Sequence, residues 1–470
     1  MTNRDTSLAS LLRPESVAVV GASDNPDKVG GRPLRYLLTQ GFKGRIYPVN
    51  PRAKEIQGVA AFASLDALPE VPDVAILCIG SDQAEAQLET CARLGVRNAI
   101  LFASGYAEVG TDGRARQQRL ARICREGGVR LVGPNCIGSS NFSTGAVLSF
   151  ASVFTDTAPL DGPVGIISQS GGVGVCAYAL LRAQGIGVRY VITSGNEADV
   201  DTADYMQALA ADDAVKLVLL YIENVSDLQR MRAALEAAAR RGLPVLALRA
   251  GCSAEGMRSA GCHTGASGAA SAEINRIFND LGCRTVDCFD ELVASVPLYL
   301  GSAWNGPRAQ SVPGYALLSN SGAACVMAAD EAARRGLRQA VLSSQSRKRL
   351  DELLPDFSLN RNPIDLTAML LSDSSLLGTT LRATLDDPDV DAASLGLYAI
   401  GGPSYDTPRF ARDTAAAANA TRKPIAVYSP HVHVRNLFAS NGLAVYSSES
   451  EALQALQRFV SHRDATRQHG

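Results

Sequence analysis

The chain has 470 residues, of which 46% are hydrophobic and 20% are charged, with a formal net charge of −2. This composition is typical of a globular protein, and at roughly 150 residues per domain the length predicts about three domains. The near-zero net charge gives no indication of a nucleic-acid or polybasic membrane surface, so we expect neither kind of partner.

Targeting and cysteine patterns predict a cytoplasmic protein. Residues 1–5 do not lead into the apolar segment of a signal peptide, and no run of about 18 apolar residues indicates a membrane span. The ten cysteines are dispersed without a C-x-x-C pair, which favours a reduced chain over a disulfide framework. We expect no metal site.

Apolar runs typical of buried strands alternate with helical patterns along the first third of the chain. These runs are 16–20, 46–50, 74–79, 98–102 and 130–132. Near-continuous apolar strands separated by helices indicate a parallel sheet that is covered on both faces. We therefore predict an α/β fold that opens with a Rossmann-type domain over residues 1–140.

Two further α/β units follow. A Ser/Thr/Ala-rich stretch at 141–161, which we interpret as a linker or a hairpin, opens a second domain predicted over 141–300. Its strands are expected at 164–168, 188–193, 217–221 and 244–248. A segment of linker composition, 301–313, precedes a third unit predicted over 314–462.

The second and third predicted domains open on similar sequences. Residues 166–172 read IISQSGG and residues 317–323 read LLSNSGA, which indicates a duplicated flavodoxin-like unit. Each turn leads into a helix, whose N-terminal N–H groups and dipole favour an anion such as phosphate. The candidate phosphate-binding residues are Ser168, Ser170, Gly171, Gly172, Ser321 and Gly322. In the second copy, a purely structural role of the turn is equally compatible with the sequence.

The turn after the first strand suits a nucleotide phosphate. Gly21-Ala22-Ser23 leads towards a helix, and its small residues let a phosphate approach backbone N–H groups. The charge of Lys28 suits the same ligand. The G-x-G-x-x-G pattern is absent, and Asn50 stands where an acidic residue would hold the ribose of NAD, so an NAD role is disfavoured.

Two more candidate ligand-binding turns follow later strands of the same sheet. Ser104 and Gly105 follow the fourth strand, and Asn135 and Cys136 follow the fifth. Ligands of open α/β sheets bind at the carboxyl ends of the strands. Cys136 is not expected to act as a nucleophile, because the first 262 residues contain no histidine to activate it.

The most informative histidine is His263, set among small residues in the sequence AGCHTGA at 260–266. It follows the strand-like run 244–248, so we expect it on an exposed Gly-rich loop, where an imidazole is able to accept a phosphoryl group. Glu223 follows the run 217–221, and a carboxylate beside an imidazole fixes its tautomer and raises its nucleophilicity. Taken alone, either residue is more simply explained as part of an ordinary loop.

Together these motifs resemble the NDP-forming acyl-CoA synthetases, also called ADP-forming acetyl-CoA synthetases, which are relatives of succinyl-CoA synthetase. The similarity covers nearly the whole chain, and the motifs stand in the family's order. They are the opening turn at 17–30, GRIYPVNP at 44–51, GPNCIG at 133–138, SQSGG at 168–172, HTG at 263–265 and NPIDLT at 362–367.

The resemblance implies both a fold and a reaction. It implies a CoA-binding domain followed by two flavodoxin-like domains of succinyl-CoA-synthetase type. Acyl-CoA, ADP and phosphate would be interconverted with a carboxylic acid, CoA and ATP through an acyl phosphate and a phosphohistidine at His263, which Glu223 would orient. The same resemblance assigns CoA binding to Gly21, Ala22, Ser23, Lys28, Asn50, Pro51, Ser104, Gly105, Asn135 and Cys136.

The resemblance also implies a partner. The family's nucleotide site lies in an ATP-grasp module, for which the three predicted units leave no room. ATP or ADP and Mg²⁺ are therefore expected on a separate ATP-grasp β-type subunit, in a hetero-oligomer or beside a homodimer of α units. Arg249 stands where the family usually has lysine, which keeps the charge but changes the geometry. No residue pattern identifies the small carboxylic acid.

Three other functions remain as alternatives. One is a non-catalytic protein that binds CoA or acyl-CoA, which the presence of both His263 and Glu223 disfavours. Another is an offshoot that uses the acyl phosphate for acyl or carbamoyl transfer, which a partner without an ATP-grasp domain would favour. An NAD-dependent dehydrogenase ranks last, since the acidic ribose anchor is missing.

Overall fold

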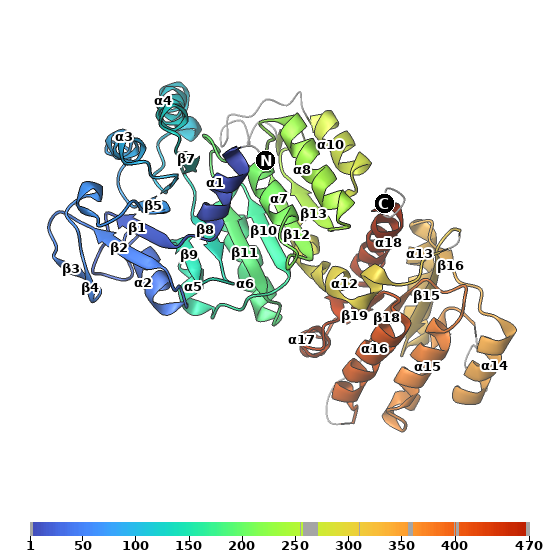
Figure 1. Ribbon diagram of the computed structural model, residues 1–470. Helices are drawn as coiled ribbons and strands as arrows, with labels where there is room; N and C mark the ends of the chain where they lie inside the picture. The colour runs from blue at the N-terminus through green and yellow to red at the C-terminus, as the bar shows by residue number, and fades with distance from the viewer. Residues whose placement is uncertain are drawn as a thin grey trace. The chain divides into compact units, whose positions relative to one another are not determined.

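The computed structural model describes residues 3–253, 255–256, 271–309, 311–355, 361–398, 400 and 404–466. The chain divides into two compact units, Met1–Asp287 and Cys288–Gly470, which we call the first and the second unit (Figure 1). Among the helices of these described ranges, none is long and apolar enough to cross a membrane.

The first unit begins with a parallel five-stranded sheet in the order β2-β1-β5-β6-β7. Every residue of β1 is buried, as expected of a strand that is covered on both faces. The strands are β1 (Ser16–Val20), β2 (Arg45–Val49), β5 (Val74–Leu77), β6 (Asn98–Leu101) and β7 (Arg130–Val132), with the short pair β3 (Glu55–Ile56) and β4 (Val59–Ala60). The helices are α1 (Asn3–Leu12), α2 (Arg32–Thr39), α3 (Ala84–Leu94) and α4 (Thr111–Gly127), with 3₁₀ turns η1 (Leu65–Ala67) and η2 (Ala107–Val109).

The second sheet of the first unit has seven strands in the order β14-β13-β12-β10-β11-β8-β9. The stretch interpreted as a linker or hairpin holds an antiparallel hairpin that starts before residue 141 and adds two strands beside β11. The strands are β8 (Gly138–Asn141), β9 (Ala146–Ser149), β10 (Val164–Ser168), β11 (Val188–Thr193), β12 (Leu217–Ile222), β13 (Val245–Arg249) and β14 (Cys283–Val286). The helices are α5 (Val153–Asp156), α6 (Gly171–Ala183), α7 (Thr202–Ala210), α8 (Leu228–Arg240) and α10 (Ser271–Asp280).

The second unit holds a parallel sheet in the order β16-β15-β18-β19-β20, with β17 paired to β15. Its strands are β15 (Gly314–Ser319), β16 (Arg338–Gln339), β17 (Ile364–Asp365), β18 (Ala392–Gly396), β19 (Ile425–Tyr428) and β20 (Ala444–Tyr446). The helices are α11 (Phe289–Ala294), α12 (Val296–Leu300), α13 (Gly322–Arg334), α14 (Ser344–Leu353), α15 (Leu376–Leu385), α16 (Thr407–Thr421), α17 (Val432–Ala439) and α18 (Glu449–Thr466), with 3₁₀ turns η4 (Ser302–Asn305) and η5 (Ala368–Leu371). The hydroxyl of Tyr446 on β20 donates to the carbonyl of Ala294 on α11 (3.4 Å), so these early helices pack within this unit.

All three sheets follow one winding rule. Counted along the chain, the main parallel strands of each sheet lie in the order 2-1-3-4-5, so the winding reverses between the first and third strands. In open α/β sheets, ligands bind in the crevice at the carboxyl ends of the strands beside this switch point. The switch points are β1/β5, β10/β12 and β15/β18.

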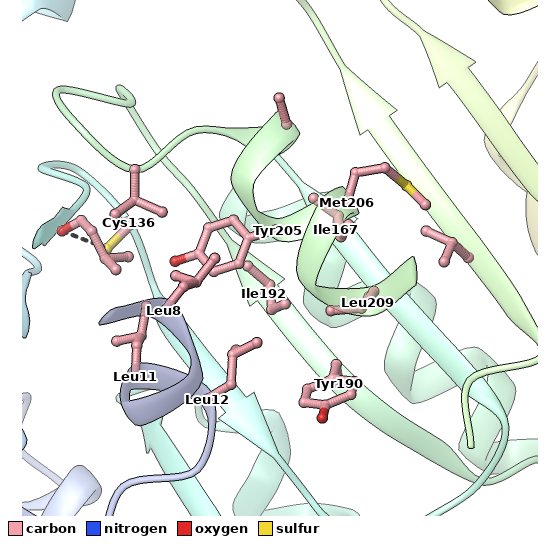
Figure 2. Close-up of a cluster of buried hydrophobic side chains, with 14 of the residues drawn as sticks. Leu8, Leu11, Leu12, Cys136, Ile167, Tyr190, Ile192, Tyr205, Met206 and Leu209 are labelled. Atoms are coloured by element: carbon pink, nitrogen blue, oxygen red, sulfur yellow. Dashed lines mark hydrogen bonds between the residues drawn. The ribbon is translucent and has the colours of Figure 1, made fainter. Parts of the chain in front are cut away.

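One cluster of buried hydrophobic side chains in the first unit includes residues of both sheets. Val19 and Ile100 of the first sheet belong to the same cluster of buried side chains as Ile167 and Ile192 of the second. Figure 2 shows Leu8, Leu11 and Leu12 of α1 with other members of this cluster, and all three leucines are buried. The labelled members of the cluster in Figure 2 are Leu8, Leu11, Leu12, Cys136, Ile167, Tyr190, Ile192, Tyr205, Met206 and Leu209.

Candidate functional site

The opening turn, Gly21 to Ser23, lies at the first switch point. Gly21 has a φ of +80°, and a Cβ built there would lie 2.4 Å from the carbonyl oxygen of Cys78. The N–H groups of Gly21 and Ala22 donate to the carbonyl of Val49 (3.0 and 3.3 Å). Only glycine fits this backbone, which lets the turn lie directly against the neighbouring strand.

Two amide side chains hold the opening turn. Asn50 donates from Nδ2 to the carbonyl of Ala22 (2.9 Å), which gives this predicted residue a defined supporting role. Gln57 donates from Nε2 to the carbonyls of Ser23 (2.9 Å) and Gly31 (3.0 Å). Sequence reasoning missed Gln57, although its Gln-Gly pair in a short β-turn was a visible signal of a hairpin.

Other predicted CoA-binding residues surround this turn. Lys28 and Pro51 are exposed beside it. In the turn that follows β6, Ser104 is exposed. The N–H of Gly105 in the same turn donates to the carboxylate of Glu108. Asn135 has a φ of +55° and its N–H donates to the carbonyl of Ala103 (2.9 Å).

Cys136 differs from its neighbours because its side chain is directed into the core. The residue is 3% exposed, and its thiol lies 3.5 Å from the carbonyl oxygen of Leu101. Burial raises the pKa of this thiol to about 12. These observations agree with the expectation that Cys136 is not a nucleophile, and they restrict any contact with a ligand at this position to the backbone.

Asn196, which follows β11 of the second sheet, connects this sheet to the turns that follow β6 and β7 of the first sheet. Its Nδ2 donates to the carboxylate of Glu108 and to Oε1 of Gln117 (3.0 Å), while its Oδ1 accepts from Nδ2 of Asn135 (3.2 Å). Its backbone N–H donates to the carbonyl of Pro134 (2.9 Å). The sequence did not indicate Asn196, because all these partners are distant along the chain.

The Ser-x-Ser-Gly turn of the first unit, for which the sequence predicts an anion site, lies at the second switch point. Ser168 is fully buried and donates to the carbonyl of Ser170 (2.6 Å), and Ser170 caps α6 by accepting from the N–H of Val173 (3.4 Å). Gly172 is exposed at the helix N-terminus, while a Cβ on Gly171 would meet Ile137 at 2.4 Å. The arrangement leaves a helix N-terminus, which is favourable for an anion, at the edge of the sheet.

Gln169, in the same turn, clamps the backbone that carries Glu223. Its Oε1 accepts from the N–H groups of Glu223 (2.6 Å) and Asn224 (3.0 Å), and its Nε2 donates to the carbonyl of Asn224 (2.7 Å). Oε1 of Glu223 accepts from the hydroxyl of Tyr221 (3.1 Å). Glu223 is thereby held beside the N-terminal turn of α6.

Arg249 places a positive charge at the end of β13, the strand that pairs with β12, which leads to Glu223. Arg249 ends β13 in register with Ile222, and its guanidinium donates to Oδ1 of Asn275. Burial lowers the pKa of Arg249 from its ordinary value. From this strand the chain enters residues 257–270, so His263 lies outside the described residues and its role stays a prediction.

The second Ser-x-Ser-Gly turn repeats the helix cap of the first but not its charge. Ser321 caps α13 by accepting from the N–H of Ala324 (3.4 Å). Oδ2 of Asp365, however, would lie 2.9 Å from a Cβ built on Gly322. A carboxylate beside a helix N-terminus already compensates the dipole and repels an anion, so the phosphate role of Ser321 and Gly322 is less favoured than that of the first turn.

Two family models match the chain. A CoA binding domain matches residues 15–141, and a succinyl-CoA ligase like flavodoxin domain matches residues 161–299. These matches define the class of the chain: an α/β protein in which a CoA-binding domain precedes a succinyl-CoA-ligase-like flavodoxin domain. The predicted fold class is confirmed.

Individual relatives narrow this class. Acetate–CoA ligase [ADP-forming] II subunit alpha of Pyrococcus furiosus is 32% identical over 81% of this chain and 80% of the relative. Trans-feruloyl-CoA synthase FCS1 of an unknown prokaryotic organism is 33% identical over 80% of this chain, which spans 53% of that relative. The solved dinucleotide forming acetyl-coenzyme A synthetase 1 of Candidatus Korarchaeum cryptofilum, in complex with phosphate and ADP, matches with a TM-score of 0.85 and 26% identity over 98% of both chains. The chain belongs to the family of ADP-forming acyl-CoA synthetases, which are acid–thiol ligases, and corresponds to their α subunit.

Proposed function

We propose that the chain is the α-type subunit of an ADP-forming acyl-CoA synthetase that transfers a phosphoryl group through His263. The observation that carries the proposal is the second switch point, where the Gln169 clamp holds Glu223 beside the N-terminus of α6. The chain leaves the neighbouring strand there towards His263. Similarity to the Pyrococcus furiosus α subunit supports the same conclusion.

On the CoA side, the turns of the first sheet are proposed to hold CoA. The small residues Gly21, Ala22 and Ser23 let the ligand approach the turn closely, and the ammonium group of Lys28 supplies positive charge for a phosphate of CoA. Asn50 supports the opening turn through its hydrogen bond to the carbonyl of Ala22. The turns with Ser104 and Asn135 lie further along the same edge, where the thiol end of the ligand would reach the second sheet.

The proposed reaction proceeds in two displacements. Phosphate attacks the thioester carbonyl of acyl-CoA, which releases CoA thiolate and forms an acyl phosphate. A nitrogen of His263 then attacks phosphorus, the P–O bond to the acyl group breaks, and the carboxylate leaves. The N-terminus of α6 offsets the charge of the phosphoryl group, and Glu223 accepts a hydrogen bond from the imidazole and fixes its tautomer.

The phosphoryl group finally passes to ADP on a separate subunit. Relatives of this chain are named α subunits, which supports a β-type partner with an ATP-grasp site for the nucleotide and Mg²⁺. We propose a small carboxylic acid as substrate. Curated relatives between 28% and 33% identical are named for acetate, 4-hydroxybutyrate and feruloyl-CoA, so the acid itself is to be established with a panel.

Intact-mass measurement tests the proposal. The purified chain is incubated with acetyl phosphate, or with a panel of acyl-CoAs and inorganic phosphate, and compared with His263→Ala. We expect an acid-labile gain of one phosphoryl group that is absent in His263→Ala. Measurable CoA binding without any phosphoryl gain would instead support a non-catalytic CoA-binding protein.

A further inference from the structure

Asn196 lies where turns of the two sheets of the first unit meet. It belongs to the turn of residues 194–197, which follows β11 of the second sheet. Gly195 in this turn has a φ of +63°, and a Cβ built on it would lie 2.5 Å from the carbonyl oxygens of Pro134 and Asn135. The N–H of Asn196 donates to the carbonyl of Pro134 (2.9 Å). The backbone after β11 is therefore in direct contact with the backbone after β7.

Glu108, in η2, orders the turn that follows β6. Its Oε1 accepts from the N–H of Gly105 and from the N–H of Tyr106 (3.1 Å). These two N–H groups are thus directed at Glu108 and not at a ligand, while Ser104 is the exposed residue of the turn. Burial raises the pKa of Glu108, but hydrogen bonds from Asn196 and from these N–H groups outweigh it and hold the pKa below its ordinary value. The carboxyl group is ionised at neutral pH.

The side chain of Asn196 joins this carboxylate to the turn after β7. Its Nδ2 donates to Oε2 of Glu108 and to Oε1 of Gln117 (3.0 Å), which uses both hydrogens of the amide. Its Oδ1 accepts from Nδ2 of Asn135 (3.2 Å). If the amide turned over, its oxygen would face a carboxylate and its NH₂ would face another NH₂, so all three bonds would be lost together.

We propose that Glu108 and Asn196 are a pair of positioning residues, which hold the turns after β6 and β7 at a fixed place relative to the end of β11. Strand β11 pairs with β10, which ends in the Ser-x-Ser-Gly turn of the second switch point. The pair would thereby set the place of the thiol end of CoA relative to that turn, without touching the reacting atoms. This role rests on the proposed function, whereas the link between the turns is a structural claim that is tested separately.

The first variant is Asn196→Asp, which keeps the size and shape of the side chain. One carboxylate oxygen is still able to accept from Asn135. The oxygen that replaces Nδ2 faces the carboxylate of Glu108 and the amide oxygen of Gln117, and acceptors cannot hydrogen-bond to one another. The matched control is Asn436→Asp, the same change at an exposed position on α17 of the second unit.

Amide hydrogen exchange of the full chain at one fixed pH measures the link. In Asn196→Asp, repulsion between the two carboxylates displaces Glu108, so we expect the N–H groups of Gly105 and Tyr106 to exchange roughly tenfold faster than in wild type. Exchange in β1 is the internal reference for global folding, and Asn436→Asp should exchange like wild type. Unchanged exchange at Gly105 and Tyr106 in a folded Asn196→Asp protein would overturn the proposal.

The double variant Glu108→Gln/Asn196→Asp exchanges the donor and the acceptor of the pair. In Glu108→Gln alone, the new NH₂ faces Nδ2 of Asn196, and two donors cannot hydrogen-bond. In the double variant that NH₂ is able to donate to the new carboxylate, and the net charge of the pair equals that of wild type. We expect exchange at Gly105 and Tyr106 to return towards the wild-type rate, even if Asn196→Asp alone does not fold. Losses that add in the double variant would contradict a direct link.

A ratio of two rates measures the positioning role. Phosphoryl gain is followed with inorganic phosphate and the acyl-CoA of the panel that labels wild type fastest, and separately with acetyl phosphate, which bypasses the thioester. Because misplacement of a reacting group slows its chemistry, we expect the acyl-CoA rate divided by the acetyl phosphate rate to fall roughly tenfold in Asn196→Asp and to recover in the double variant. General loss of structure would lower both rates together. An unchanged ratio would reject the pair as positioning residues.

The two measurements separate the two claims. A wild-type chain that gains no phosphoryl group from acyl-CoA contradicts the proposed function, while hydrogen exchange still decides whether Glu108 and Asn196 hold the turns together. Conversely, phosphoryl gain in wild type with the same ratio of rates in Asn196→Asp leaves the proposed function intact and rejects the positioning role.

Discussion

Gln169 and Asn320 hold equivalent positions in the two Ser-x-Ser-Gly turns, and each clamps the backbone across its own switch point. Asn320 accepts from the N–H of Tyr398 at Oδ1 (2.8 Å) and donates from Nδ2 to the carbonyl of the same residue (2.6 Å). Gln169 makes the matching pair of interactions with Glu223 and Asn224. The internal repeat therefore extends from the sequence to the hydrogen bonds that join the two strand ends at each switch point.

The first prediction concerns the clamp in the second unit. Asn320→Ala removes two hydrogen bonds to the partly buried backbone of Tyr398, so we expect a loss of about 1–3 kcal/mol in the stability of this unit. Hydrogen exchange resolved by segment measures the change. The loss should be confined to the second unit, and faster exchange in β10 or β12 would contradict this local role.

The second prediction concerns Gln57, which supports the opening turn. Gln57→Ala removes the donors to the carbonyls of Ser23 and Gly31, and we expect CoA affinity to fall about tenfold, the equivalent of about 1.4 kcal/mol. Calorimetric titration with CoA gives the affinity. Gln83→Ala is the control, because Gln83 is exposed and its side chain makes no capping hydrogen bond to α3. Equal affinities for the two variants would remove Gln57 from the CoA site.

The third prediction compares two glycines with positive φ: Gly58, in the turn between β3 and β4, and Gly21, in the opening turn. Their substitution by alanine separates the cost of backbone strain from the cost of steric overlap. Gly58 has a φ of +79° with nothing within 4 Å of a built Cβ, whereas a Cβ on Gly21 meets Cys78 at 2.4 Å. Gly58→Ala should cost only the left-handed strain, roughly 1–2 kcal/mol. Gly21→Ala should cost clearly more and also weaken CoA binding. Urea unfolding midpoints and CoA titration compare the two, and equal costs would show that the turn yields to a side chain.

The fourth prediction concerns the pH dependence of stability. Desolvation raises the pKa of Glu197 to about 8, and Asp201 raises it further by repulsion while Ser194 lowers it. Tyr205 also faces this carboxyl group, and Asp201 is ion-paired with Arg230. Because the folded protein holds the proton more tightly than the unfolded chain, this stabilisation is complete below pH 4.5 and is lost as the pH rises through 8.

Glu197→Gln removes this titration. Its stability relative to wild type should therefore increase between pH 5 and pH 8, whatever the absolute cost of the substitution. Denaturant unfolding at pH 5, 6.5 and 8 measures the difference. If wild type and Glu197→Gln differed by the same free energy of unfolding at all three pH values, the pKa of Glu197 would not be raised in the folded protein.

Much of the fold follows from apolar runs in the sequence. Predicted runs 16–20 and 130–132 coincide with β1 and β7, and the run 244–248 is within one residue of β13. The parallel direction of the strands follows from the alternation of strands and helices, whereas their order within each sheet is seen only in the structure. Two-residue strands such as β16, with the polar sequence Arg338-Gln339, carry no such signal and are fixed by pairing with β15.

Polar residues in buried or clamping positions were the part that sequence reasoning could not place. Ser139 and Ser140 of β8 are buried, because β8 lies between two other strands, although nothing in their polarity predicts it. Gln57 and Asn196 both bind partners that lie far away along the chain. Strand-end turns indicate where a ligand binds, but the side chains that hold those turns become visible only in three dimensions.

The buried cluster that both sheets of the first unit share limits how far the two sheets can move relative to each other. Because leucines of α1 and strands of both sheets share one set of buried contacts, the strand-end turns of the first sheet and the Glu223 turn cannot separate without disrupting that core. Under the proposed function, the distance between the thioester and the phosphoryl chemistry would thus be set when the chain folds and would stay constant during turnover.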